Sequence, residues 1–331
     1  MTLPEEFAPK GPKLSRFAVR PAPPVRPQLL PDEARFTLRL ALLAGGAELA
    51  AWAWIVAAPR PVGALVAALR LSRFAWARLG VSAPRPLIAF ALLFVALGAQ
   101  GASLVAGPLW AGAACGLCAL GELCASAVGD AVTVERRPAA FAWLDVGQAI
   151  GVALGIAVGS ALSIWAPAIA AAGLLAGSVG VLDLRDRGTP RSAWPLRVYF
   201  EALRAPLGVQ LSVLAFFIGA AGVFAARGVH GWLAFGIPLL GMGLAARLEP
   251  RMLNAVALPR ALALVAVAGA ACVVLGRPAL APSFGLIALG GAATALPASI
   301  ARAGAELLRA PTSGLVWSAL ALGAGVGSLV L

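Results

Sequence analysis

Charged and titratable side chains are scarce in this sequence. Only 12% of its 331 residues are charged, it has a single histidine, and 61% of it is hydrophobic. Average soluble proteins carry about 25% charged residues. A soluble domain of this composition would expose large apolar patches, whereas a lipid bilayer solvates them. The composition therefore excludes an ordinary soluble protein. It predicts an all-α polytopic membrane protein, because helices satisfy their own backbone hydrogen bonds in lipid.

Motifs for catalysis and metal binding are also missing from the sequence. It contains no Walker loop, no HExxH motif, and no pairing of its one histidine, His230, with a serine. The four cysteines lie in apolar runs, without the spacing of a disulfide framework or a zinc ribbon. Cys115, Cys118 and Glu122 would share a helix face, but no histidine is near them. We therefore expect neither an enzyme nor a bound metal or cofactor.

Eleven apolar runs are long enough to cross a bilayer, which takes about 20 residues, or roughly 17 without tilt. We therefore expect about eleven transmembrane helices. The runs cover residues 38–58, 61–79, 86–105, 109–130, 140–163, 166–183, 209–226, 231–247, 256–276, 281–301 and 312–331.

The distribution of basic residues predicts the orientation. The net charge of +12 falls in clusters between apolar runs rather than on one face, so we expect no nucleic-acid partner. With the N-terminus in the cytoplasm, only Arg60, Arg227 and Arg277 of the 26 basic residues fall in outer loops. This asymmetry agrees with the positive-inside rule. It predicts a multi-pass protein of the plasma (inner) membrane, with its N-terminus inside and its C-terminus outside.

The chain divides into a tail and two membrane halves. Residues 1–36 are rich in proline and basic residues, which predicts a disordered cytoplasmic tail, with a docking tail for a protein partner as the alternative. Residues 37–183 hold six apolar runs, 184–208 form a basic cytoplasmic linker, and 209–331 hold five runs.

Short matches indicate that the second half repeats the first. Ala77-Arg78-Leu79 matches Ala246-Arg247-Leu248, Ala125-Ser126 matches Ala298-Ser299, and Arg137 matches Arg309. The offsets in the numbering, from 169 to 173, are nearly constant. A repeat of six spans keeps its orientation, so we expect parallel repeats related by an axis along the membrane normal.

The segment Glu135 to Leu162, ERRPAAFAWLDVGQAIGVALGIAVGSAL, resembles the fourth inner loop and fifth helix of the major facilitator superfamily of transporters. Gly147, Gly151, Gly155 and Gly159 recur every four residues and give one smooth helix face, as close packing in lipid requires. The resemblance implies a secondary transporter that moves an unknown small solute by alternating access, with proton coupling as one option. The first and fourth helices would line the central cavity.

A second hypothesis is a non-transporting membrane subunit or assembly factor of a larger membrane complex, which would contact a protein partner through the N-terminal tail or the membrane-facing surface. The twelfth span of the family is missing, the spans of the second half hold almost no ionisable residue, and the tail is proline-rich. The loop after the second span, RFAWARLGVSAPR, also lacks the acidic residue of the family's motif.

Ionisable residues at membrane depth are candidates for function, because they are costly to place there. From the helical rise per residue, Glu48 lies about 15 Å from the inner face and Arg70 about 14 Å from the outer face, at similar depth. Glu122 and Arg73 also share a level. We expect two acid–base pairs, Glu48 with Arg70 and Glu122 with Arg73. They would serve proton or substrate coupling or form structural ion pairs; alternatively, both arginines extend to the inner surface.

A second group of charges lies at the expected inner ends of the first-half helices. It could form a network that latches an inner gate, or it could be ordinary solvated loop charge. Its members are Asp130, Asp145, Arg136, Arg137, Arg78 and Arg85.

The expected topology can be tested with reporters fused to Leu331. Because the positive-inside asymmetry places this residue outside, a periplasmic alkaline phosphatase fusion should be active and a cytoplasmic fluorescent fusion dark. The reverse pattern would show that the number of spans is even.

Overall fold

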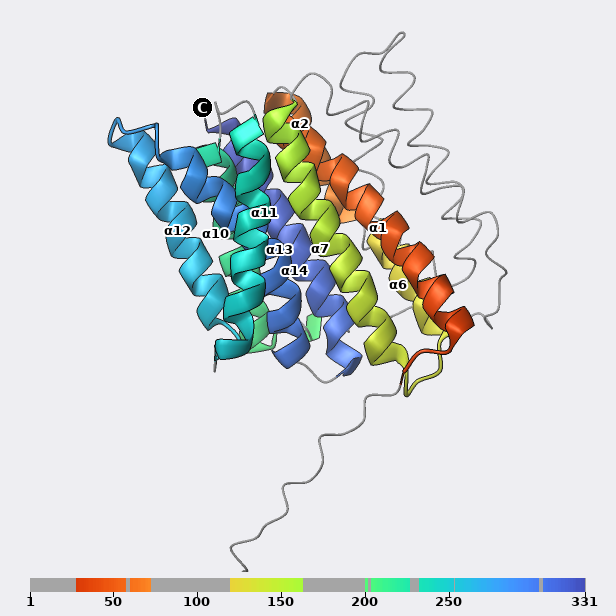
Figure 1. The fold of residues 1–331 in the computed structure, drawn as a ribbon. Coiled ribbons are helices and arrows are strands. Elements are labelled where there is room, and N and C mark those ends of the chain that lie inside the picture. Colours follow the sequence, from red (N-terminus) through yellow and green to blue (C-terminus); the bar gives the residue numbers. More distant parts are fainter. Residues whose placement is uncertain are drawn as a thin grey trace, which may run out of the picture.

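The computed structural model describes residues 28–57, 60–72, 120–162, 200–201, 204–226, 232–252, 254–303 and 306–330. These residues form helices and short connections, with no strand among them (Figure 1). The helices are α1 (Pro31–Ala57), α2 (Arg60–Leu69), η2 (Arg70–Ser72), α6 (Leu120–Ala131), α7 (Arg137–Ala161), α10 (Pro206–Ala226), α11 (Trp232–Leu248), η3 (Glu249–Arg251), α12 (Ala257–Val274), α13 (Ala281–Ala303) and α14 (Glu306–Leu329).

Six helices in the described part of the chain are long and apolar enough to cross a membrane: α1, α7, α10, α12, α13 and α14. The prediction of an all-α polytopic membrane protein is therefore confirmed. Nine of the eleven predicted spans contain a helix at the expected place. The runs 86–105 and 166–183 lie outside the described residues, so the number eleven stays a prediction.

Helix α1 begins at Pro31, earlier than the apolar run that starts at residue 38 and inside the segment 1–36 assigned to a disordered tail. Proline suits the first helical position, and Asp32 and Glu33 complement the positive end of the helix dipole. The backbone N–H of Leu30 donates to Oε2 of Glu33 at 3.0 Å, which is half of a capping box. The start of α1 is therefore determined by its helix-capping residues rather than by the start of the apolar run.

The glycine face of α7 lies against α1 (Figure 1). A Cβ added at Gly155 would lie 2.6 Å from the carbonyl oxygen of Leu49, and one at Gly159 would lie 2.9 Å from that of Ala53. At Gly151 the added carbon would overlap the carbonyl oxygen of Gly45. The two backbones are thus in direct contact over successive turns, which only glycine permits.

The second half repeats this contact between α10 and α14. A Cβ at Gly323 would overlap the carbonyl oxygen of Phe216, as one at Gly151 would overlap that of Gly45. In the numbering, Phe216 corresponds to Gly45 at an offset of 171, and Gly323 corresponds to Gly151 at an offset of 172. Both offsets fall within the range given by the short sequence matches. The same pair of backbone contacts therefore recurs in both halves.

The two halves meet through two sets of helices. On one side α2 packs on α14, where a Cβ at Gly325 would lie 2.8 Å from the Cβ of Ala67. On the other side α7 packs on α11 and α13. Residues near the ends of α1 and α2 that face α14 therefore lie at the boundary between the halves.

Substitution of a contact glycine should destabilise the fold. Gly151→Ala inserts a methyl group into a backbone contact, and such overpacking costs about 1–3 kcal/mol. We expect the melting temperature in detergent to fall by roughly 3–10 °C. The matched control is Gly129→Ala on α6, where an added Cβ meets nothing within 4 Å. Alanine favours helix over glycine, so the control should melt at an equal or higher temperature. Equal loss in both variants would contradict the packing analysis.

Candidate functional site

An ion pair joins α1 to the end of α2. Nη2 of Arg70, the first residue of η2, donates to Oε1 of Glu48, and each residue is only 3% exposed. Glu48 lies nine residues before the end of α1, and Arg70 lies ten residues after the start of α2. From the helical rise per residue, both are about 14 Å from the connection between the helices, so helix geometry alone brings them to one level.

The burial of this pair bears on one of the alternatives, the extension of Arg70 to the inner surface. A side chain of Arg70 that extended along lipid to the membrane surface would be exposed, and it is not. The other carboxylate oxygen of Glu48, Oε2, is buried without a hydrogen-bond partner among the described residues. A carboxylate oxygen in this state can accept a proton or a donor from a ligand, and leaving it unsatisfied is costly at low dielectric.

The pair lies beside the boundary between the halves. Helix α14 of the second half contacts α2 and, to a smaller extent, η2 and α1. A change in the position of Arg70 would therefore alter the contact of η2 with α14.

The second predicted pair, Glu122 with Arg73, lies outside the described part of the structure. Arg73, Arg78 and Arg85 lie outside the described residues. Glu122 and Asp130 belong to α6, which packs on α1 and α7. Their side chains are outside the described part of the structure.

The first half carries a different charge contact at its other end. Nη1 of Arg136 lies 3.3 Å from Oε2 of Glu33, and Nε of Arg137 donates to the carbonyl of Val132 at 3.1 Å. Arg136 thus ties the connection before α7 to the first turn of α1. Glu33 was missed because it falls in the segment taken for a tail. Asp145 is half-buried on α7.

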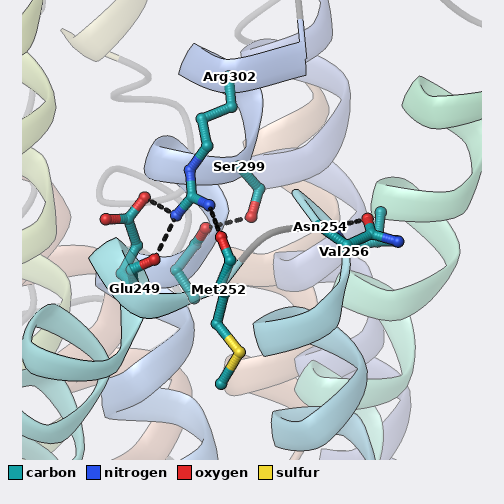
Figure 2. A network of polar contacts seen from close by, with 7 residues as sticks. Glu249, Met252, Asn254, Val256, Ser299 and Arg302 are labelled. Atoms are coloured by element: carbon teal, nitrogen blue, oxygen red, sulfur yellow. Dashed lines mark hydrogen bonds and ion pairs between the residues drawn. The ribbon is translucent and has the colours of Figure 1, made fainter.

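A comparable network closes one end of the second half (Figure 2). Arg302, in the last turn of α13, forms an ion pair with Glu249 and donates to the carbonyl oxygens of Glu249 and Met252, each at 2.7 Å. Oδ1 of Asn254 accepts the N–H of Val256 at 3.0 Å in the following turn. Arg302 therefore fixes the end of α11 and η3 to α13. The position of Arg302 after an apolar run was a signal in the sequence, because a basic side chain is favourable at the carboxyl end of a helix.

Proteins similar to this chain were found by comparison with solved structures. No family model and no curated protein sequence matches the chain. Among solved structures, a bacterial homologue of the human lysosomal transporter Spinster, in an inward-facing conformation, matches with a TM-score of 0.58 at 17% identity over 91% of this chain and 81% of that one. The human organic anion transporter MFSD10 gives 0.55 at 19% over 91% and 93%. A D-xylose–proton symporter gives 0.58 at 12% over 90% and 88%.

The chain has the major facilitator fold. The resemblance of its glycine-stepped segment to that family is therefore confirmed at the level of fold. The contact of α1 with α7 recurs as that of α10 with α14, in agreement with two pseudo-repeated halves. The relation of the repeats by an axis along the membrane normal stays a prediction.

The coupling between Glu48 and Arg70 can be measured by a double-mutant cycle. Arg70→Leu leaves a buried carboxylate without its cation, which costs about 3–5 kcal/mol. We expect a large loss of monodisperse protein and of melting temperature in detergent. Adding Glu48→Gln should recover most of the loss, because the orphaned charge is removed. Arg35→Leu, at an exposed position of α1, is the control and should melt like the wild type. Equal instability of the single and double variants would mean that the pair is not coupled.

Proposed function

We propose that the chain is a secondary transporter that moves a small solute by alternating access and couples this movement to protons through Glu48. The observation that carries the proposal is the buried Glu48–Arg70 pair, with one unsatisfied carboxylate oxygen, beside the boundary between the halves. The major facilitator fold supports the same function, because the neighbours with this fold are transporters by their descriptions.

Protonation of Glu48 is the proposed coupling step. A proton bound at Oε2 removes the negative charge, and the attraction for the guanidinium of Arg70 is lost with it. Arg70 would then move toward other acceptors or toward the solute. Since η2 contacts α14, this movement would change the contact between the halves. The coupling free energy is the difference in affinity of the two conformations for the proton.

The two charge networks at the ends of the helices would keep each half rigid during this movement. The contact of Glu33 with Arg136 joins parts of the first half, and that of Glu249 with Arg302 joins parts of the second. Neither crosses the boundary between the halves. In this proposal they do not break in the transport cycle, unlike a latch between halves.

The membrane placement follows from the basic residues. We propose a location in the plasma (inner) membrane with the N-terminus in the cytoplasm, and two halves at 37–183 and 209–331 joined by the linker 184–208. Helix α10 begins at Pro206, so the last residues of this linker are already helical.

The descriptions of the neighbours suggest probes. One is a D-xylose–proton symporter and another an organic anion transporter. Proteoliposomes with a trapped pH-sensitive dye can be tested with D-xylose, other monosaccharides and a panel of organic anions. A solute that moves with protons changes the internal pH without an imposed gradient.

The decisive variant is Glu48→Gln, which keeps the shape of the side chain and removes its titration. Because Arg70 loses its buried anion, we expect a lower melting temperature than that of the wild type. The amide oxygen of the glutamine can still accept a hydrogen bond from Arg70, so folded protein should remain for the dye assay, in which proton-coupled solute movement should be lost. The matched control is Glu135→Gln, at an exposed position before α7, which should transport like the wild type. Full coupled transport by Glu48→Gln would overturn the coupling role. If the wild type moves no solute from a broad panel, a non-transporting subunit becomes the better description.

A further inference from the structure

Three exposed arginines surround the connection between α11 and α12. Arg247 lies in the last turn of α11, Arg251 ends η3, and Arg260 lies in the first turn of α12. Only residues 252–256 separate η3 from α12, so all three lie at the same end of the bundle. Glu249, the one acidic residue between Arg247 and Arg260 in the sequence, is paired with Arg302. The three charges are therefore not neutralised by this acid.

An exposed apolar face on α11 runs into this cluster. Gly236, Leu240, Gly243 and Arg247 follow one another at steps of four, three and four residues and share one face. Leu240 is 55% exposed, and a Cβ at Gly236 or Gly243 would meet nothing within 4 Å. The face is thus apolar and open on both sides of Leu240, and it ends in a cation.

Helix α12 carries a similar face. Arg260, Leu264, Val267 and Ala271 follow at the same steps and are all exposed, with Leu264 at 71%. From Arg260 to Ala271, as from Arg247 to Gly236, the face is eleven residues or about 16 Å long. One leaflet of the hydrocarbon core is about 15 Å thick. Each face is therefore about as long as one leaflet is thick, with an arginine at one end.

Helix α13 brings the two faces together. A Cβ at Gly291 of α13 would lie 2.7 Å from Cδ2 of Leu262 on α12 and 3.5 Å from the carbonyl oxygen of Gly241 on α11. The two helices therefore flank one point of α13. Figure 1 shows the short connection between α11 and α12 at one end of the bundle, and both helices pack on α13. Their exposed faces and their arginines therefore lie on two helices that share α13 as a packing partner.

We infer that this surface, made of the exposed faces of α11 and α12 with Arg247, Arg251 and Arg260, binds an anionic phospholipid. The apolar faces receive the acyl chains, and the guanidinium groups bind the phosphate, for which their paired N–H groups are well suited. The amino end of α12 adds positive dipole charge at the same place. Basic pockets between membrane helices bind anionic headgroups by this chemistry.

The test measures binding of phosphatidylglycerol to the purified full chain in detergent, by native mass spectrometry and by the rise in melting temperature on titration. Phosphatidylcholine is the zwitterionic comparison. We expect preferential retention of phosphatidylglycerol by the wild type. The triple variant Arg247→Gln/Arg251→Gln/Arg260→Gln should bind it roughly a hundredfold more weakly, as expected for three cations near the headgroup.

The control variant removes the same number of charges elsewhere. Arg35 and Arg39 are exposed on α1, and Arg277 is exposed after the opposite end of α12. The triple variant Arg35→Gln/Arg39→Gln/Arg277→Gln has the same net charge as the test variant and should bind phosphatidylglycerol like the wild type. Equal losses in both variants would show general attraction to a basic protein and overturn the proposal.

Two further arms identify the ligand as a lipid. Leu240→Asn/Leu264→Asn keeps all arginines and changes only exposed positions, so it should remain folded and bind phosphatidylglycerol more weakly. Glycerol 3-phosphate should neither raise the melting temperature nor displace the lipid. Lipid binding that survives the apolar change, or an equal effect of glycerol 3-phosphate, would mean that the arginines bind a phosphate group alone, against the proposal.

Discussion

Direct contact between helix backbones is the interaction on which the rest of this structure depends. In lipid the hydrophobic effect does not drive helices together, since the tails are as apolar as the side chains. Association needs close packing instead, and glycine allows the backbones to touch. Gly151 against Gly45 in the first half and Gly323 against Phe216 in the second supply this contact. Each half is thereby built around one tightly joined pair of parallel helices.

The backbone contact between α1 and α7 also determines where the carboxylate of Glu48 lies. Glu48 lies on α1 between Gly45 and Leu49, both of which touch the glycine face of α7. The backbone that carries the carboxylate is therefore held on one side by α7, while its side chain reaches Arg70 on the next element. A buried ion pair is only tolerable where geometry is well fixed, because desolvation costs several kcal/mol per ion. Tight packing of α1 supplies that fixed geometry.

Sequence reasoning succeeds here where one regular helix determines the answer. The four-residue glycine step predicts a packing face, and the constant rise of an α-helix brings Glu48 level with Arg70. It fails where partners come from different elements. Nothing local shows that the face of α7 meets a mixed stripe of Ala41, Gly45 and Leu49, or that Arg302 reaches Glu249 across the fold. Glu33 was lost because a helix start was inferred from hydrophobicity, whereas proline and acidic capping residues begin α1.

The repeat retains the backbone contact between helices but not the buried charge, and this asymmetry bears on the proposed mechanism. At the offset that relates Gly45 to Phe216, Glu48 corresponds to Gly219, which serves the contact of α10 with α14. At this position the first half has the Glu48–Arg70 ion pair, whereas the second half has another contact between helix backbones. In the proposed mechanism, protonation of Glu48 would act on the first half alone, and the second half would respond as a rigid body through α14, which touches both α2 and η2. A rigid partner converts a local change in charge into movement at the boundary between the halves, because packed helices shift as units rather than deform.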